Sequence, residues 1–424
     1  MNILITHFYS RRNNGDAAIL YSQLREMRKR SPNAQLTIAT MDDLSEYPTF
    51  EGVPQVPALF STALDRHRSR WANLFHIVRS FAGSWLWAIT HRLTGHGLSL
   101  FMYRSEGTFL ASLADADIVV PVGGGYLKAN KGGMAGMMDL WLVLQPIYLA
   151  HLLGKPVIMY SQSIGPFETK PQFYFAARVL KKCRQINLRE NKSFKLLRAI
   201  GVPERVLQLT ADAAFLLEKR EFVNCLPPTV RERLNDVGRP LVGITARAWL
   251  KEQGQTLYEE QFAQAIDTII ETHGATVVLI PQVVAADLGD DDRTIQNRIY
   301  SKLQHKDRVV NIEDELSFKE LKALYGQLDY LIGTRFHSVI FSLTEHVPAI
   351  AIEYEHKTSG IMFDLGLEKW VVPIDQVSAL QLTTLFNELA RERSGYLSHL
   401  KSVLPVYIKR AHQANDLIAA MANE

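Results

Sequence analysis

The chain has 424 residues, enough for two or three domains, and its 47% hydrophobic and 21% charged residues are typical of an ordinary soluble globular protein. A net charge of +3 is too small to indicate a nucleic-acid partner. Two cysteines, Cys183 and Cys225, support neither a disulfide framework nor a cysteine-rich metal site, and they fit a reducing cytoplasm.

Strand and helix patterns alternate from the start of the chain. Met1 to Phe8 is an apolar strand without the basic start and long apolar core of a signal peptide. A helix is predicted over Asp16 to Arg30 and a strand over Gln35 to Thr40. Further strands end within "ADIVVPVGGG", "KPVIMYSQSIGP" and "QINLRE", and no apolar stretch has the length expected of a transmembrane helix. This alternation predicts a doubly wound α/β domain.

The composition changes around Asn224 to Pro240, where Pro, Asn, Asp and Arg are frequent, and the alternation then starts again. Strands are predicted in "PLVGITAR", "ATVVLIPQ" and "RVVNI", with helices over Glu259 to His273 and Phe318 to Gly326. Two similar α/β domains facing each other would place a ligand cleft between them. The predicted organisation is an N-terminal domain 1–225 with an insertion 55–105, a linker 226–238, a second domain 239–395, and a C-terminal helix 396–424 that packs back.

The stretch "DYLIGTRFHSVIFSLTEHVPAIAIEYEHK" contains two apolar runs separated by a helical pattern. The runs Tyr330 to Gly333 and Ala349 to Tyr354 fit strands buried on both faces. Between them, Phe336 to Glu345 has apolar residues at helical spacing, with Thr334 as its expected N-cap. A strand, helix and strand in this order predict a right-handed crossover between parallel strands.

Three cationic side chains follow these strands. Arg335 and His337 come after the first strand, and Lys357 comes after the second. Both strands end at the same edge of the sheet, where open α/β sheets bind ligands, and a helix N-terminus already attracts anions. We therefore predict a site for a small, multiply charged anion. Taken singly, Arg335 can pair with a surface carboxylate, Lys357 can be solvated, and His337 can be a helix-start histidine.

The loop after the first strand, "RRNNGDAAIL", offers a carboxylate. Asn14 and Gly15 favour a tight turn, and Asp16 caps or opens the following helix. Asp16 also lies at the carboxyl edge of its own sheet, where it can accept a proton from a sugar hydroxyl. Asn14 is a candidate for substrate binding in the same loop.

Other polar or glycine-rich turns follow predicted strands. Gly123 to Gly125 would let the backbone approach a ligand closely, which makes Gly124 and Gly125 candidates for substrate binding. Ser163 to Phe167 can line the same cleft. Arg189 also ends a strand and is either functional or paired with Glu190 or another acid; Asp212 and Arg247 are placed similarly. We interpret Gly289 to Arg293 as helix capping and a solvated loop rather than a metal motif.

The segment Arg66 to Arg104 has six arginines and no acidic residue, interleaved with Trp and Phe. Such a composition fits either contact with a membrane interface or a packed helical insertion with a basic rim. A substrate carried on lipid would account for the first alternative.

Taken together, several of these motifs resemble the polysaccharide pyruvyl transferase family. They are "NNGDAAIL", "GGGYL", "SIGPF", "NLRENKSF", "TADAAFLL" and "GTRFHSVIFSLTEHVPAIAIEYEHKTSGIMFDLGL". The last block is similar to the branch found in colanic-acid-type exopolysaccharide clusters. The resemblance extends from about Ile5 to about Leu367, and residues 54–104 carry no family motif.

The resemblance implies a fold of two Rossmann-like domains similar to GT-B glycosyltransferases, in a bacterial, cytoplasmic enzyme. It implies transfer of pyruvate from phosphoenolpyruvate to two hydroxyls of an exopolysaccharide sugar, with formation of a cyclic ketal and release of phosphate. It places Arg189, His337 and Lys357 at phosphoenolpyruvate and Asp16 at the acceptor sugar. Arg335 belongs to the same motif, as a contact of either the donor or the protein.

The resulting hypothesis makes His337 the acid that protonates the methylene carbon and Asp16 the base for an acceptor hydroxyl. We expect no cofactor and no metal, since phosphoenolpyruvate is a donor substrate. The acceptor is a sugar, for which a lipid-linked oligosaccharide is one candidate. Two alternatives stay open: a GT-B glycosyltransferase that uses a nucleotide sugar, and a non-catalytic anion-binding protein of the same pathway.

Overall fold

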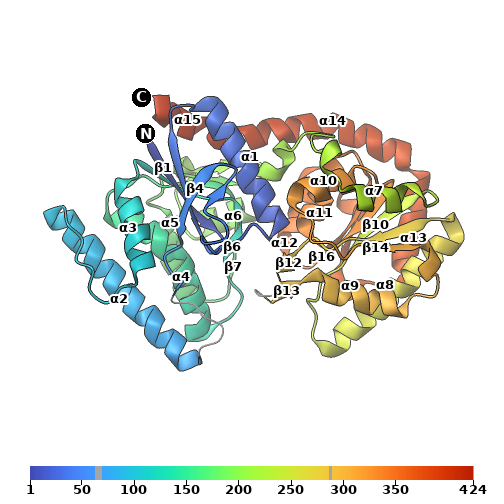
Figure 1. Ribbon diagram of the computed structural model, residues 1–424, viewed down its shortest axis with the longest axis horizontal. Coiled ribbons are helices and arrows are strands. Elements are labelled where there is room, and N and C mark those ends of the chain that lie inside the picture. Colours follow the sequence, from blue (N-terminus) through green and yellow to red (C-terminus); the bar gives the residue numbers. More distant parts are fainter. Residues whose placement is uncertain (63–68, 286–288, 424) are drawn as a thin grey trace. The chain divides into compact units, whose positions relative to one another are not determined.

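The computed structural model describes residues 1–62, 69–285 and 289–423, which form two compact units (Figure 1). Unit 1 contains residues 1–11 and 19–213 and the C-terminal end from Ala411. Unit 2 contains residues 12–18 and 214–410. This division differs from the predicted one at three places. The main boundary precedes the expected linker 226–238, the loop 12–18 belongs to unit 2, and most of the expected C-terminal helix also belongs to unit 2.

Unit 1 is built on two neighbouring, mainly parallel sheets. Their strand orders are β3-β4-β2-β1-β5 and β6-β7-β8-β9, and among these described strands only the β3–β4 pair is antiparallel. A parallel bridge between Val119 and Val157 joins the two sheets, as expected of a doubly wound arrangement. The strands are β1 (Asn2–Phe8), β2 (Gln35–Thr40), β3 (Thr49–Phe50), β4 (Val53–Pro57), β5 (Ile118–Pro121), β6 (Gly124–Ala129), β7 (Ile158–Phe167), β8 (Gln185–Leu188) and β9 (Leu207–Leu209).

Helices cover the sheets of unit 1 because the parallel strands are apolar on both faces. The helices are α1 (Asn14–Arg30), whose first residues belong to unit 2, α2 (Arg70–Thr94), α3 (Arg104–Asp115), α4 (Gly133–Leu152), α5 (Lys170–Leu180), α6 (Asn191–Ala199) and α15 (Asp416–Asn423). Among the described helices, α4 alone is long and apolar enough to cross a membrane, a length that the sequence analysis did not anticipate. Its Leu140, Leu144 and Ile147 are buried in the core of unit 1, as in a core helix.

The predicted insertion 55–105 contains the end of β4 and the long helix α2. Ser69 accepts a hydrogen bond from the Ala72 amide and caps the start of α2, and Gly95, with φ +77°, ends it in the left-handed conformation. Trp87 is buried, whereas Trp71 is exposed. Part of the helix is therefore packed, as in the alternative of a packed helical insertion, and part of it is exposed to solvent.

Unit 2 has a six-stranded parallel sheet with the order β14-β11-β10-β15-β16-β17, and a separate β12–β13 antiparallel pair. The strands are β10 (Leu241–Thr245), β11 (Thr276–Leu279), β12 (Val284–Ala285), β13 (Asp290–Asp291), β14 (Val309–Asn311), β15 (Tyr330–Gly333), β16 (Ala349–Glu353) and β17 (Val371–Pro373). The helices are α7 (Pro228–Asn235), α8 (Glu252–His273), α9 (Asp292–Lys302), α10 (Phe318–Tyr325), α11 (Phe336–Thr344), α12 (His356–Asp364), α13 (Ala379–Arg391) and α14 (Arg393–His412).

The strands predicted in unit 2 are confirmed, and helix starts are the main differences. Helix α8 begins at Glu252, ahead of the expected Glu259, and α9 begins at Asp292 instead of Thr294. All five residues of β10 are buried, in agreement with a sheet covered on both faces. The predicted α/β class is thus confirmed within each unit.

Candidate active site

The carboxyl edge of the unit 2 sheet collects the cations that the sequence analysis singled out. Along this sheet the chain order reverses between β10 and β15, which pair in parallel, and such a switch point is where open α/β sheets bind ligands. Arg247 follows β10, His337 follows β15, and Lys357 follows the neighbouring strand β16. The predicted crossover β15-α11-β16 is confirmed, so the first turns of α11 and α12 begin at the same edge.

The N-cap of helix α11 lies one residue later than predicted. The N-cap residue is Arg335, and the prediction of Thr334 is wrong. The Thr334 hydroxyl instead shares a 3.0 Å hydrogen bond with Tyr258, and its backbone amide donates to the Thr245 carbonyl oxygen. His337 is consequently the second residue of the helix, within the first turn as expected, where free amides and the helix dipole favour an anion.

Arg335 is held by carboxylates of the protein. Its Nε donates to Asp292 Oδ1 at 2.9 Å and its Nη2 donates to Asp290 Oδ1 at 2.5 Å, and both Arg335 and Asp292 are buried. Burial opposes the charge on Arg335, but the two carboxylates outweigh it and raise the pKa of the guanidinium. The arrangement suits a residue that fixes the start of α11 better than one that contacts a ligand.

The interpretation of Gly289 to Arg293 was partly wrong. Asp291 does cap α9, because it accepts a hydrogen bond from the Arg293 amide at 3.0 Å. The loop is not simply solvated, however, since Asp292 is buried against Arg335 and also accepts from the backbone amides of Gln282 and Val283. Its carboxylate therefore links the loop before α9 to the start of α11.

Replacing Asp292 by asparagine should lower the free energy of unfolding by about 1–3 kcal/mol, because a charge-assisted bond to a buried guanidinium is lost. Urea unfolding of the purified chain measures the change. Asp314→Asn is the matched control, since Asp314 pairs with Arg233 at the exposed surface, and such pairs contribute about 0–1 kcal/mol. Equal stability of the two variants would show that the buried pair is not a clamp.

Lys357 and Arg247 surround Tyr354, a residue that the sequence analysis had assigned only to a strand. Lys357 Nζ lies 5.7 Å from the centre of the Tyr354 ring, and Arg247 Nη1 donates to the Tyr354 hydroxyl at 2.8 Å. Burial alone would raise the pKa of this phenol, but the positive charges of Lys357, Arg247 and Arg335 outweigh burial and lower it. Three cations therefore lie close to Tyr354 at this edge, together with the carboxylates that pair with them.

Lys357 also has a carboxylate partner. Its ammonium group lies 2.8 Å from Glu355, and both side chains are only partly exposed. The alternative of a fully solvated Lys357 is thus wrong. A ligand anion would compete with Glu355 for this cation or share it.

Residues 12–18, which are the turn before α1 together with the first residues of that helix, reach this edge. Asn14 Nδ2 donates to the carbonyl oxygens of Gln282 and Leu316, both at 3.0 Å, and Asn13 forms an antiparallel bridge with Val283. The two amide hydrogens of Asn14 are therefore used within the protein. Asn14, predicted as a substrate-binding residue, anchors the loop in unit 2.

Gly15 lies directly against the ring of His337. A Cβ atom added to Gly15 would be 1.9 Å from His337 Nδ1, far inside van der Waals contact. Asp16 is the next residue, and its Oδ2 accepts from Asn13 Nδ2 at 2.8 Å. The predicted assignment of Asp16 and His337 to different domains is therefore wrong, because residues 12–18 belong to unit 2 together with His337.

In unit 1, three of the sequence motifs meet around Arg189. Its Nε donates to Ser163 Oγ at 2.7 Å and its Nη1 donates to Asp212 Oδ2 at 2.5 Å, with Arg189 and Asp212 both buried. The acid that pairs with Arg189 is thus Asp212. Glu190 instead caps α6, where it accepts from the Ser193 amide at 2.8 Å.

The predicted glycines of unit 1 lie next to this group of residues. Gly124 and Gly125 begin β6, and Gly124 pairs with Gln162 of β7. Their neighbour Gly123 is closely packed, since an added Cβ would be 2.9 Å from Ile19 Cγ2 and 3.0 Å from the Ser161 carbonyl oxygen. The glycines therefore permit close packing of the backbone at the carboxyl edge of β5.

His7, at the end of β1, was missed by the sequence analysis. It adopts φ +67°, rare for a residue other than glycine, and its ring stacks on Tyr126 at 4.9 Å. Its Nε2 lies 2.8 Å from the Val143 carbonyl oxygen. Burial lowers the pKa of His7 to about 4, against the opposing effect of the bond to Val143.

His7 should make the fold sensitive to acid. Because its folded pKa of about 4 lies below the value of about 6.5 for free histidine, the unfolded chain binds a proton that the folded chain does not. The free energy of unfolding should therefore fall as the pH is lowered from about 6.5 to 4. Urea unfolding at several pH values should give a shallower fall for His7→Asn, which cannot take up the proton and tolerates positive φ. An unchanged slope would remove His7 from the acid response.

A family model for polysaccharide pyruvyl transferases matches residues 13–356. The chain belongs to this family. The match begins at Asn13, in the loop that contacts His337, and ends one residue before Lys357. It therefore includes Gly15 and His337 and stops just short of Lys357.

Other proteins are similar to this chain in sequence or in fold. The amylovoran biosynthesis protein AmsJ of Erwinia amylovora is 27% identical over 375 residues, which cover 87% of this chain and 86% of that protein. Among solved structures, HepE of Anabaena in complex with UDP-glucose is similar with a TM-score of 0.58 and 10% identity, over 100% of this chain and 99% of HepE. A UDP-GlcNAc 2-epimerase from Neisseria meningitidis has a TM-score of 0.57 and 11% identity, over 100% of both chains. These likenesses confirm the predicted GT-B-like fold class.

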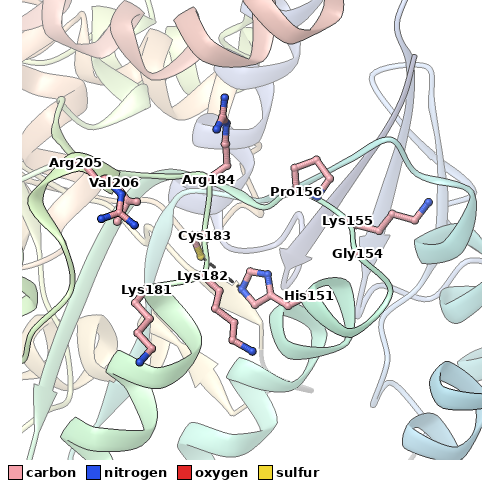
Figure 2. A pocket seen from close by; sticks show the side chains of 10 residues that line it. All are labelled: His151, Gly154, Lys155, Pro156, Lys181, Lys182, Cys183, Arg184, Arg205 and Val206. Atoms are coloured by element: carbon pink, nitrogen blue, oxygen red, sulfur yellow. Dashed lines mark hydrogen bonds between the residues drawn. The ribbon is translucent and has the colours of Figure 1, made fainter. Parts of the chain in front are cut away.

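A cavity of about 560 Å³ in this pyruvyl transferase family member lies away from the carboxyl edges (Figure 2). Its lining includes Lys155, Arg184 and Arg205, which precede β7, β8 and β9 respectively. The cavity is therefore at the amino edge of the unit 1 sheet. Since ligands of α/β sheets bind at the opposite edge, we do not assign the catalytic site to this cavity.

Proposed function

We propose that the chain transfers pyruvate from phosphoenolpyruvate to a sugar of an exopolysaccharide repeat unit, forming a cyclic ketal. Membership of the pyruvyl transferase family and similarity to an amylovoran biosynthesis protein support the general reaction. The observation that carries the proposal is the position of His337. It lies in the first turn of α11, against Gly15, at an edge that also holds Lys357 and Arg247.

The proposed donor site lies at the carboxyl edge of the unit 2 sheet, beside Lys357 and Arg247. Phosphoenolpyruvate carries a phosphate and a carboxylate, and an anion with two charged ends suits the first turns of α11 and α12 with the ammonium of Lys357 between them. Arg335 fixes the start of α11 through Asp290 and Asp292 and so positions His337. Arg189 stays a proposed donor contact. It belongs to unit 1, and Asp212 and Ser163 hold its guanidinium in place.

The proposed chemistry balances in protons. Protonated His337 gives a proton to the methylene carbon of phosphoenolpyruvate, which leaves positive charge on the adjacent carbon. An acceptor hydroxyl adds to that carbon, and Asp16 takes its proton. A second hydroxyl of the same sugar closes the ketal, and its proton passes to the departing group, which leaves as hydrogen phosphate. The proton held by Asp16 returns through solvent to His337. Lys357 stabilises negative charge on the donor, and the scheme uses no metal or cofactor.

We propose a cytoplasmic reaction on a sugar acceptor that is linked to lipid. Cys183 is a buried free thiol and Cys225 an exposed one, in agreement with a reducing compartment. The decisive experiment incubates the chain with labelled phosphoenolpyruvate and candidate lipid-linked oligosaccharides and identifies the product by mass spectrometry. A pyruvylated sugar with stoichiometric phosphate is expected. Turnover only with a nucleotide sugar would favour a glycosyltransferase, and binding without turnover would favour an anion-binding pathway protein.

Replacing Lys357 by alanine should weaken the binding of phosphoenolpyruvate about ten-fold or more, because a charge-assisted bond contributes about 1.5–3 kcal/mol. Isothermal calorimetry measures the affinity. Lys369→Ala is the control, since Lys369 pairs with Glu388 and Glu392 at the exposed surface and should leave the affinity unchanged. Unaltered affinity of a folded Lys357 variant would exclude this residue from the donor site.

A further inference from the structure

Helix α2 packs against the rest of unit 1 through part of its apolar surface. Ile77, Trp87 and Ala88 are buried. The ring of Trp85 stacks on Tyr148 of α4 at a distance of 4.8 Å between ring centres. Helix α2 contacts α3 and α4, and Figure 1 shows α2 at the periphery of unit 1.

Two groups of apolar side chains on α2 are exposed to solvent, and together they are called the stripe. Trp71, Leu74, Phe75 and Val78 lie in the first turns, and Ile89 and Leu93 lie near the end of the helix. Between the two groups, Trp85 packs against α4. Trp71 is 81% exposed, Leu93 77% and Phe75 66%. Leu98, Leu100 and Phe101 continue the exposed apolar surface after the helix. Half of the large apolar side chains that are exposed in the described residues lie between positions 71 and 101, which is more concentrated than scattered surface residues would be.

Cationic residues belong to the same helix. Arg79 and Arg92 are part of α2, and residues 69–104 contain no acidic residue. Arg92 donates to the Leu152 carbonyl oxygen and so ties the end of α2 to the end of α4. The cavity of Figure 2 begins there, at His151, and is lined by Lys155, Lys181, Lys182, Arg184 and Arg205 without an acidic residue.

The cations that line this cavity form no ion pair with a carboxylate among the described residues. Lys181 and Lys182 point the same way in Figure 2, away from Arg184. Positive charge left without internal partners next to an exposed apolar face suits an anionic partner that also has an apolar layer.

We propose that the exposed stripe of α2 docks on the surface of an anionic lipid bilayer, with the neighbouring cations against the lipid phosphates. The tryptophan and phenylalanine rings suit the bilayer interface, and each cation near an anionic surface adds favourable energy. The helix would lie in the interface and not cross it, because it is packed on α4 through Trp85 and because α2 is not among the described helices that are long and apolar enough to span. The proposal does not depend on the pyruvyl transfer reaction.

The test is co-sedimentation of the full chain with vesicles of phosphatidylcholine, with and without phosphatidylglycerol. We expect binding to the anionic vesicles at low salt, weaker binding to the neutral ones, and loss of the difference at high salt. The variant Trp71→Ser/Phe75→Ser/Leu93→Ser should bind the anionic vesicles at least about ten-fold more weakly, since three apolar side chains no longer insert.

The matched control is Leu257→Ser/Leu380→Ser/Val406→Ser, which removes three exposed apolar residues of unit 2 and should bind like the unaltered chain. A second arm, Lys181→Gln/Lys182→Gln/Arg184→Gln, should reduce binding to anionic vesicles and leave binding to neutral ones unchanged. Circular dichroism confirms that each variant is folded. The proposal is overturned if the stripe variant binds vesicles as the unaltered chain does. It is also overturned if the unaltered chain does not bind anionic vesicles at low salt. A stripe-dependent dimer that ignores vesicles would also overturn it, in favour of a second copy of the chain.

Discussion

Replacing His337 by glutamine should lower the turnover of pyruvyl transfer by about 10²–10⁴-fold, the usual contribution of a general acid or base. Glutamine keeps some hydrogen-bonding capacity, but it has no transferable proton and no positive charge beside the donor phosphate. The affinity for phosphoenolpyruvate should therefore also fall. Phosphate release measures turnover, and calorimetry measures donor binding. His305→Gln, which removes an exposed histidine paired with Glu271, is the control and should leave both unchanged.

Asp16→Asn separates the acid from the base. It keeps the size of the side chain and removes the basic carboxylate, so turnover should fall by a similar factor while the affinity for phosphoenolpyruvate stays nearly intact. If both variants turn over at nearly the natural rate, these two residues do not carry the chemistry.

Gly15→Ala is expected to reduce turnover by about 10²-fold without unfolding the chain, because a displacement of about 1 Å in a catalytic group can cost that much. The added Cβ would be 1.9 Å from His337 Nδ1, so the imidazole has to move. The loop itself is secured by Asn14, which donates to Gln282 and Leu316. Gly15 does not need positive φ, so the loss would come from the displaced ring and not from backbone strain.

Gly395→Ala provides the comparison for Gly15→Ala, since Gly395 lies in α14 and an added Cβ there meets no atom within 4 Å. It should leave turnover unchanged. A crystal structure of the Gly15 variant should show His337 in another rotamer. Normal turnover of the Gly15 variant with an unmoved ring would contradict the contact and with it the proposed place of His337.

The strand–helix–strand unit around His337 could be predicted because its pattern is local. Two continuous apolar runs enclose a helical repeat, and the parallel order of β15 and β16 then follows from the length of the crossover. The position of His337 in the first turn of α11 needed no information beyond this stretch.

The partners of the site residues could not be predicted in the same way, because they lie far away along the chain. Asn14 contacts the backbone at Leu316, and Arg335 pairs with acids that we had interpreted as a helix cap and a solvated loop. No spacing rule connects such positions. Tyr354 gave no signal either, since the end of an apolar strand looks the same whether or not its last side chain faces two cations.

The anchoring of the loop 12–18 in unit 2 has a consequence for work with shortened chains. A fragment that begins at residue 214 contains the whole six-stranded sheet, His337 and Lys357, yet it lacks the loop that lies against the imidazole. In such a fragment the carbonyl oxygens of Gln282 and Leu316 lose the donor supplied by Asn14, and the ring of His337 loses its neighbour Gly15. Unit 2 is therefore not encoded by one contiguous stretch of the gene, and a fusion of residues 12–18 to residues 214–410 would be the smallest piece to retain the complete edge.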